Sequence, residues 1–319
     1  MKRIIYIICI FSLGYSRKVL SQSSNQNYIQ KRVYQNENAT KHLDILNYYN
    51  GIGQLVQTIQ KEVTPTGKDL VELQEYDIVG RQTKSWLPVT SSGNGDYVNP
   101  VVIKNSQALY NQDTSPYSEV QYQPTPLGDE SKRFGPGQNW YNNDKSIRTT
   151  YLVNNSSDSL ACIAFAVSGS RMNTQLNKVS DLYPSGELLV IRVINEDNNV
   201  SYTFKDKSGK ILLNRQVNIS NDNNKIFLDT YMVYDNAGNL CYVLPPLAKE
   251  KLIGTIWNDD NQIIKEYVYV YKYDERFRCV KKRLPGTDWI YQVFDQKNRI
   301  VMTQDGKDRL EDKWTYCVY

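Results

Sequence analysis

The sequence predicts an all-β protein built from successive antiparallel hairpins. Along many short segments, apolar and aromatic residues alternate with polar ones, which is typical of strands with one buried face. Between these segments a turn pattern recurs, an aspartate followed three residues later by glycine, as in Tyr234-Asp-Asn-Ala-Gly238. The 25 tyrosines far outnumber the 7 phenylalanines, and this favours strands whose rings have one apolar and one polar end.

The turn pattern has a physical explanation. Asp235 can open a type I turn, because its side chain can bond the backbone two residues further on. Gly238 then occupies the position that needs a left-handed conformation, which glycine adopts without a Cβ penalty. We therefore expect each copy of the pattern to form a β-hairpin.

The first 40 residues have a different character. Lys2 and Arg3 precede an apolar run, residues 4–14, that is too short to span a bilayer as a helix. We interpret residues 1–21 as a signal peptide, with a buried N-terminal strand as the alternative, and residues 22–40 as a polar arm. No later segment is apolar enough for a second membrane anchor.

Residues 41–184 are interpreted as an N-terminal β-rich domain with long loops. Hairpins are expected at 41–63, around Tyr49 and Gly53, and at 70–87, around Tyr76 and Gly80. We expect a loop or insertion at 90–113 with a short helix near 105–110, a strand at 119–123 and a long loop at 124–144. Residues 147–153 and 160–167 are predicted to pair, and 171–181 is helix or loop.

Residues 185–319 are interpreted as a sheet of the same repeats that is incomplete at the C-terminus. Strands are predicted at 187–194, 200–204, 211–217, 226–235, 239–244, 263–274 and 288–295, a short helix at 245–252, a turn at 304–306, and the start of a strand at 314–319. Phe277 stands where glycine is expected, so that turn should deviate from the others, whereas Asn298 is tolerated there. The residues with expected structural roles in turns are Tyr49, Gly53, Tyr76, Asp77, Gly80, Arg81, Asp206, Gly209, Tyr234, Asp235, Gly238, Asn239, Tyr273, Asp274, Phe294, Asp295, Asn298 and Arg299.

These motifs resemble the RHS/YD-repeat family, specifically the amino-terminal region of large exported bacterial RHS proteins. The resemblance covers about residues 40–90 and 185–319, and it includes Ser85-Trp-Leu-Pro88 and Leu244-Pro-Pro246. It implies a curved or spiralling sheet, part of an open β-shell that can enclose a carboxy-terminal toxin or adhesive domain. Lys205 and Phe277 depart from the motif, and the self-cleaving core of the family is absent. Tyr319 falls about where the next motif tyrosine belongs, so we expect a truncated chain.

The sequence offers little support for catalysis or cofactor binding. His42 is the only histidine and no G-x-S-x-G motif is present, which argues against a serine hydrolase. The glycines at 51–53 and 135–137 lack the lysine of a phosphate loop. Because the aspartates recur at one repeat position, we interpret them as turn caps. We expect no enzyme, cofactor or metal; calcium at 197–199 or 258–260 is the alternative to solvated turns.

Charge, cysteines and tryptophans complete the expectations. The net charge of +4 is scattered, which argues against nucleic-acid binding. Cys162, Cys241, Cys279 and Cys317 are expected to be free thiols, with one bridge among the last three as an alternative. The five tryptophans are expected to pack in the sheets, with sugar-stacking platforms as the alternative.

We hypothesise a non-enzymatic structural part of an exported RHS/YD-repeat protein, a scaffold or shell for envelope display or toxin delivery. The expected location is the periplasm, the cell surface or the medium. Expected partners are further repeats of the same protein or a C-terminal cargo domain. The alternative is a carbohydrate-binding or adhesive module with glycan partners, and a glycosidase is the least favoured hypothesis.

Overall fold

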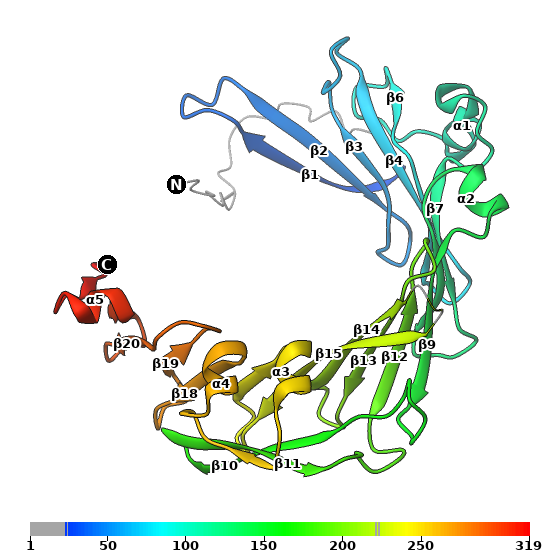
Figure 1. Cartoon of the computed structure of the whole chain (residues 1–319). Coiled ribbons are helices and arrows are strands. Elements are labelled where there is room, and N and C mark those ends of the chain that lie inside the picture. Colours follow the sequence, from blue (N-terminus) through cyan, green and yellow to red (C-terminus); the bar gives the residue numbers. More distant parts are fainter. Residues whose placement is uncertain (1–22, 24, 221, 223) are drawn as a thin grey trace. The chain divides into compact units, whose positions relative to one another are not determined.

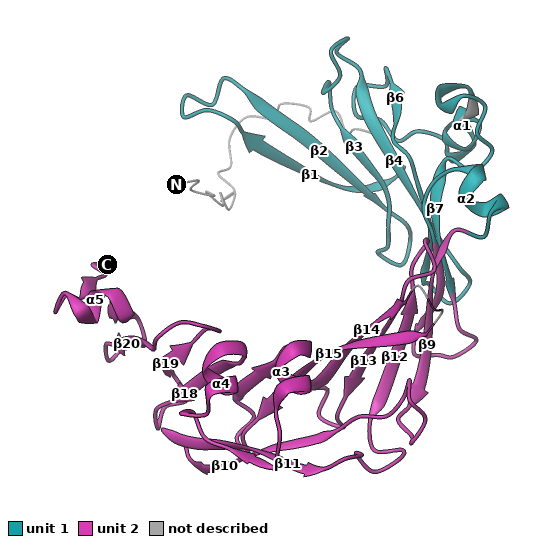
Figure 2. Ribbon diagram, viewed as in Figure 1, with its two compact units in different colours: residues 1–121, 134–144 teal, residues 122–133, 145–319 magenta. Residues whose placement is uncertain are grey.

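The computed structural model describes residues 23, 25–220, 222 and 224–319, so the predicted signal peptide lies outside the described residues. The described chain is mostly β, which confirms the predicted fold class: 19 strands belong to one open antiparallel sheet, and three more form a small second sheet (Figure 1). The chain divides into two compact units, residues 1–121 with 134–144 and residues 122–133 with 145–319 (Figure 2). Among the described residues, no helix has the length and apolarity needed to cross a membrane.

In unit 1, consecutive strands pair in chain order from β1 to β5. β6 returns to pair with β4, and β7 pairs with β5. The strands are β1 (Asn27–Tyr34), β2 (His42–Tyr49), β3 (Leu55–Gln60), β4 (Asp69–Tyr76), β5 (Gln82–Trp86), β6 (Val89–Ser91) and β7 (Tyr117–Tyr122). β2, β3 and β4 each alternate buried and half-buried positions, as the sequence pattern predicted.

The core of unit 1 is covered by the segment that the sequence indicated as a loop or insertion. This segment contains α1 (Pro100–Lys104) and the 3-10 helix η1 (Ser106–Tyr110), and η1 coincides with the short helix predicted near 105–110. The hydroxyl of buried Tyr48 donates to the carbonyl of Gly95 at 2.6 Å. The side chain of Gln57 donates to the carbonyl of Val98 (2.6 Å) and accepts from its amide (2.9 Å). The loop is thus fixed onto the sheet by buried polar side chains.

The segment predicted as a polar arm, 22–40, contains the strand β1, which is in register with β2 over eight residues. Hydrophobic alternation is weak because almost all of β1 is exposed. What holds β1 besides the backbone pairing is a bidentate ion pair of Arg32 with Asp44, with both nitrogens 2.7 Å from a carboxylate oxygen. A polar composition therefore concealed an edge strand.

Unit 2 contains the longer run of hairpins. Its large-sheet strands are β9 (Ser146–Val153), β12 (Leu189–Ile194), β13 (Val200–Lys205), β14 (Ile211–Ile219), β15 (Lys225–Tyr234), β16 (Leu240–Leu244), β18 (Tyr269–Tyr273), β19 (Cys279–Arg283), β20 (Ile290–Phe294), β21 (Ile300–Gln304) and β22 (Thr315–Tyr316). These strands pair antiparallel in this order. β8 (Glu130–Phe134) and α2 (Gln138–Asn142) occupy the predicted long loop.

The small sheet comprises β10 (Ala164–Ser170), β11 (Asn173–Ser180) and β17 (Ile256–Trp257). Its buried Leu176 and Trp257 join one hydrophobic core with Val190, Phe204 and Tyr242 of the large sheet. The predicted pairing of 147–153 with 160–167 is wrong, because β9 pairs with β12 and β10 pairs with β11. Residues 145–184 thus pack on the second core, and the two units divide the chain elsewhere than at 184/185.

Two predicted elements near the C-terminus differ. The strand expected at 263–274 begins as α4 (Gln262–Tyr267), and only β18 is extended. The side chain of Asn261 caps this helix by accepting from the amides of Ile263 and Ile264. The turn expected at 304–306 starts α5 (Gly306–Leu310), where Asp305 and Asp308 form a capping box. The helix predicted at 245–252 is present as α3 (Pro246–Lys251).

Candidate functional sites: a repeated turn and two buried ion pairs

Seven hairpin turns in the described chain share one hydrogen-bond pattern. In the turn at Asp235, its amide donates to the carbonyl of Asn239 (3.0 Å), and the Gly238 amide donates to the Asp235 carbonyl (3.0 Å). One carboxylate oxygen of Asp235 accepts from the amides of Ala237 (3.0 Å) and Asn239 (2.8 Å). The same four bonds occur in the turns that begin at Asn50, Asp77, Asn195, Asp206, Asp235, Asp274 and Asp295.

The fourth residue of each turn has a positive φ. These residues are Gly53, Gly80, Asn198, Gly209, Gly238, Phe277 and Asn298. The expectation that the turn at Phe277 deviates is wrong: its φ is 60°, and Asp274 accepts from the amides of Arg276 and Arg278 at 2.9 Å each. The guanidinium of Arg171 lies 4.4 Å from the Phe277 ring centroid and donates to the Asp274 carbonyl at 3.4 Å. A cation–π contact of about 0.5–1 kcal/mol offsets part of the strain.

Register around the turns is also repeated. The residue before the turn aspartate or asparagine pairs with the residue that lies five positions after that aspartate or asparagine. This pair lies next to an irregularity in the strand ladder. Six hairpins have this arrangement, with the pairs Tyr49 with Leu55, Tyr76 with Gln82, Lys205 with Ile211, Tyr234 with Leu240, Tyr273 with Cys279, and Phe294 with Ile300. Lys205 therefore occupies the place of the motif tyrosine without changing the turn.

Two tyrosine hydroxyls, one before the turn at Asp77 and the other of Tyr319, contact a preceding hairpin. The hydroxyl of Tyr76 donates to the carbonyl of Leu55 (2.7 Å), and that of Tyr319 donates to Ile300 (2.9 Å). In both cases the acceptor is five residues after the aspartate or asparagine of the preceding turn. At Phe294, which has no hydroxyl, the guanidinium of Arg278 lies 5.1 Å from the ring centroid instead.

Arginine at the fifth turn position binds the second carboxylate oxygen. The Nε atoms of Arg81, Arg278 and Arg299 lie 2.8, 2.7 and 2.8 Å from Asp77, Asp274 and Asp295. Burial favours the neutral form of Asp274, but bonds from the Arg278 amide and guanidinium outweigh it, so its pKa lies below the usual 3.8. Each such carboxylate is occupied by its own turn, which supports a structural role over acid/base chemistry.

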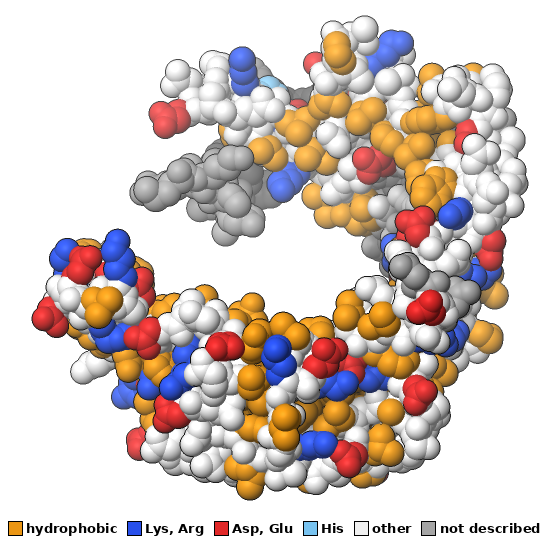
Figure 3. Space-filling model, in the orientation of Figure 1, with side chains coloured by type: hydrophobic (Ala, Val, Ile, Leu, Met, Phe, Trp, Pro, Cys, Tyr) orange, Lys and Arg blue, Asp and Glu red, His pale blue; other side chains and the backbone are white. Residues whose placement is uncertain are grey.

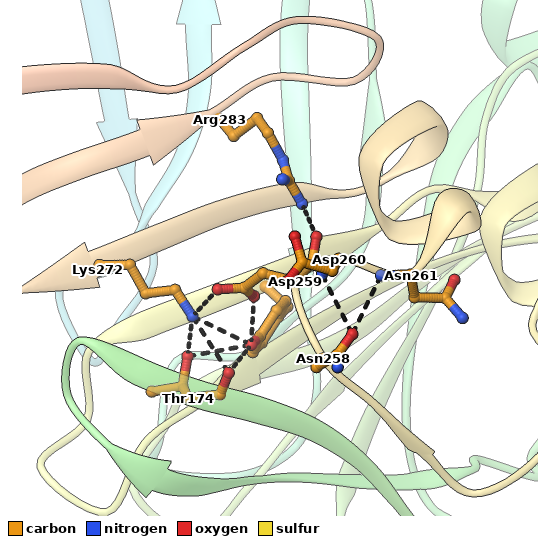
Figure 4. A network of polar contacts seen from close by, with 8 residues as sticks. Thr174, Asn258, Asp259, Asp260, Asn261, Lys272 and Arg283 are labelled. Carbon is orange, nitrogen blue, oxygen red and sulfur yellow. Dashed lines mark hydrogen bonds and ion pairs between the residues drawn. The ribbon is translucent and has the colours of Figure 1, made fainter.

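A buried ammonium connects the small sheet to the large one. Lys272 in β18 is only 1% exposed, and its Nζ lies 2.6 Å from the carboxylate of Asp259 (Figure 4). The same atom donates to Thr174 of β11, at 2.5 Å to Oγ1 and 3.2 Å to the carbonyl. The hydroxyl of Tyr242 lies 3.1 Å from the Asp259 carboxylate. Burial lowers the pKa of Lys272 below 10.5, against the opposing effect of Asp259.

Beside this network, Arg283 of β19 points toward the turn at 258–261 (Figure 4). Its Nη2 donates to the backbone carbonyl of Asp259 at 2.7 Å. The side chain of Asn258 accepts from the amides of Asp260 and Asn261 within this turn. The 258–261 turn is thus held by two buried cations, one on the carboxylate of Asp259 and one on its backbone.

A second buried ion pair crosses β14 and β15. Arg215 and Asp229 are directly opposite in register, with Nε–Oδ1 at 2.7 Å and Nη2–Oδ2 at 2.8 Å. Arg215 Nη1 also donates to the carbonyls of Asp158 and Ser159, which ties the segment before β10 to the large sheet. Near the pair, burial raises the pKa of Cys162 to about 12, so that thiol is inert near neutral pH.

The remaining sequence candidates are scattered. His42 is exposed at the start of β2, 3.8 Å from Asp44. The four described cysteines are free. Trp86 and Trp257 are buried, whereas Trp140 is 39% exposed. No cluster of three metal-binding side chains occurs in the described part of the chain. On the face seen in Figure 3, lysine and arginine are interspersed with aspartate and glutamate in unit 2.

Sequence reasoning missed the two buried ion pairs and the role of Asn195 as the capping residue of the turn predicted at 197–199. A signal existed for Lys272: it continues the period of two that places Val268 and Val270 inward. For Arg215 and Asp229 the signal was an arginine and an aspartate at inward positions of neighbouring predicted strands. The turn itself was expected at 197–199, but Asn195 was not recognised as its cap because it lies two positions before the Asp-Asn-Asn sequence.

Comparisons with known proteins place these features in context. Residues 21–153 match the family model described as domain of unknown function DUF6443. No curated protein matches the sequence. The crystal structure of TcdB2-TccC3-TEV has a similar fold, with TM-score 0.55, 12% identity and 92% of this chain covered. TcdB2-TccC3 without hypervariable C-terminal region gives TM-score 0.53 and 13% identity over 83% of this chain. The structure of TcdB2-TccC3 gives TM-score 0.52 and 12% identity over 83%.

The chain spans only 11–13% of the length of these similar chains. At this identity the likeness concerns the fold. The DUF6443 match covers less than half of the chain and, with the likeness, establishes the match and the fold only. The finer assignment of the turns as YD repeats stays a prediction.

Proposed function

We propose that this chain is a structural, non-enzymatic part of an exported RHS/YD-repeat shell that displays or delivers a cargo domain. The observation that carries the proposal is the set of seven equivalent turns at the ends of antiparallel hairpins. Such a repeat extends a sheet by one hairpin at a time with the same local geometry, which suits a wall better than a catalytic site.

Three further observations support the proposal. The fold is similar to that of a small part of the TcdB2-TccC3 chains. The turn aspartates, the candidates for acid/base chemistry, are bound within their own turns. The buried ion pairs connect elements of the scaffold, and the sequence begins with a predicted leader.

The experiment determines the cellular location of the chain and whether a cargo domain bound to it is protected from protease. Antibody detection after fractionation should find it in the periplasm, on the surface or in the medium, with a new N-terminus after Ser21. Captured under native conditions, it should be joined to or bound by a domain that resists trypsin until the shell is unfolded. The proposal would be contradicted if the chain stayed in the cytoplasm with its leader uncleaved. It would also be contradicted if trypsin digested the cargo equally before and after unfolding.

A further inference from the structure

Unit 2 contains a cleft of about 470 Å³ at α4, the end of β19 and the loop that follows it. The side chains that matter on its walls are Arg283, Lys265, Asp260, Glu266, Asp288 and Trp289. A volume of this size lies in the usual range for small-molecule sites. The cleft plays no part in the turn repeat or in the proposed scaffold role.

Arg283 is the unusual member of this wall. Arg283 is only 3% exposed, and its buried Nε has no hydrogen-bond partner among the described residues. Its one hydrogen bond in that set runs from Nη2 to the backbone carbonyl of Asp259, whose carboxylate is bound to Lys272. Burial lowers the pKa of Arg283, which reflects an incompletely compensated charge. A buried cation of this kind is costly unless an anion joins it.

Each acidic side chain of the cleft has a polar partner other than Arg283. Asp260 lies 3.4 Å from Lys265, and Asp288 lies 2.5 Å from Arg309. Glu266 accepts a hydrogen bond from the side chain of Gln262 at 2.5 Å. The indole of Trp289 lies 4.5 Å from the Arg283 guanidinium, which offsets part of its desolvation but supplies no hydrogen-bond acceptor in the plane of Nε.

We propose that this cleft binds the carboxylate of an acidic sugar of the uronic-acid type. A planar carboxylate matches the donors of a guanidinium. The three carboxylates on the wall disfavour a dianion such as phosphate, yet they accept hydrogen bonds from sugar hydroxyls. Trp289 offers an apolar surface for the C–H groups of a pyranose ring. A neutral sugar would bring no anion to the Arg283 guanidinium.

The test measures the binding of glucuronate to the full chain by titration calorimetry at low salt. Saturable one-to-one binding is expected. Glucose, which lacks the carboxylate, and acetate, which lacks the hydroxyls, should each bind at least tenfold more weakly. Arg283→Gln should weaken glucuronate binding at least tenfold. Arg276→Gln, a change at an exposed turn arginine outside the cleft, should leave it unchanged.

Because Arg283 is buried, Arg283→Gln can also alter folding, so a second readout uses the wild-type chain. The indole N–H resonance of Trp289, identified by its loss in Trp289→Phe, should shift with glucuronate and not with glucose. Absence of saturable binding, equal binding by folded Arg283→Gln, or an unmoved Trp289 signal would overturn the site. Equal binding of acetate and glucuronate would overturn the assignment to a sugar.

Discussion

The hydroxyl of Tyr273 donates a 2.9 Å hydrogen bond to the backbone carbonyl of Leu240. Leu240 starts β16 and Tyr273 ends β18, and these two strands are paired. Tyr76, which ends β4, repeats this relationship with Leu55, which starts the paired strand β3. In these two hairpins the motif tyrosine therefore joins one hairpin to the one before it, which gives a physical reason for tyrosine rather than phenylalanine at these positions.

Replacing Tyr273 with phenylalanine should destabilise the fold by about 0.5–1.5 kcal/mol, since one buried hydrogen bond is lost and the Leu240 carbonyl is left unsatisfied. Urea unfolding measures this difference. Tyr269→Phe is the matched control, because the hydroxyl of Tyr269 makes no hydrogen bond within the described residues and its ring is equally half-buried. Equal effects of the two changes would show that the bond to Leu240 contributes nothing.

Asp235→Ala removes the acceptor of two backbone amides and should cost about 1–2 kcal/mol. Asp235→Asn should cost much less, because Asn50 and Asn195 form the same turn with an amide oxygen. Thermal unfolding of both variants checks the order. A penalty for asparagine as large as that for alanine would mean that the charge, and not the hydrogen-bond geometry, determines the turn.

Gly238→Ala should cost about 1–2 kcal/mol, because the φ of Gly238 is +88° and the left-handed conformation penalises a Cβ. Gly238→Asn should be milder, since Asn198 and Asn298 already occupy this position. Gly51→Ala serves as control, because its added Cβ meets open space and its φ lies outside the positive region. Denaturant titration that ranks Gly51→Ala as the more damaging change would refute the expectation.

Lys272→Met should destabilise unit 2 by about 3–5 kcal/mol, because it removes the ion-pair partner of Asp259. Adding Asp259→Asn to the same chain should restore a large part of this loss, since no uncompensated carboxylate then remains. A double-mutant cycle from chemical unfolding gives the coupling. Additive effects of the two changes would show that the pair contributes no coupling.

Acid should weaken the fold through the turn aspartates. In the folded state the pKa values of Asp77, Asp274 and Asp295 lie below the ordinary 3.8. Their ionised forms therefore stabilise the fold above that value, and this contribution is lost as the pH falls through the lowered pKa values. The free energy of unfolding, followed from about pH 5 to about pH 2, should fall less steeply in Asp274→Asn than in the wild type. Identical slopes would contradict this link.

Much of the fold was predictable because it depends on local chemistry. The turns at Asp77, Asp206 and Asp235 combine a capping carboxylate with glycine, and both requirements are visible in the sequence. Phe277 was misjudged because the local pattern does not reveal its contact with Arg171, which is distant in the sequence. β1 was missed because its residues are exposed and a strand held by backbone pairing and one ion pair leaves little apolar pattern.

The ion pairs and the Arg283 cleft were hidden for a different reason. Which inward polar residues meet depends on strand order and on the placement of β10, β11 and β17, and the sequence misled us about the partner of β10. Once Thr174 and Asp259 lie over β16 and β18, Lys272 has its partners. Alternation alone indicates that Lys272 points inward, but it does not identify what Lys272 contacts.

Amide-resolved hydrogen exchange tests the central claim, that the seven turns share one geometry. In each turn the amides of the first, third, fourth and fifth residues donate hydrogen bonds, and the second donates none within the described residues. We predict slow exchange at those four amides, including Phe277, and fast exchange at Ile78, Asn236, Glu275 and Gln296. Fast exchange throughout the turns at Asp274 and Asp295, or protection of the second amide, would contradict the account.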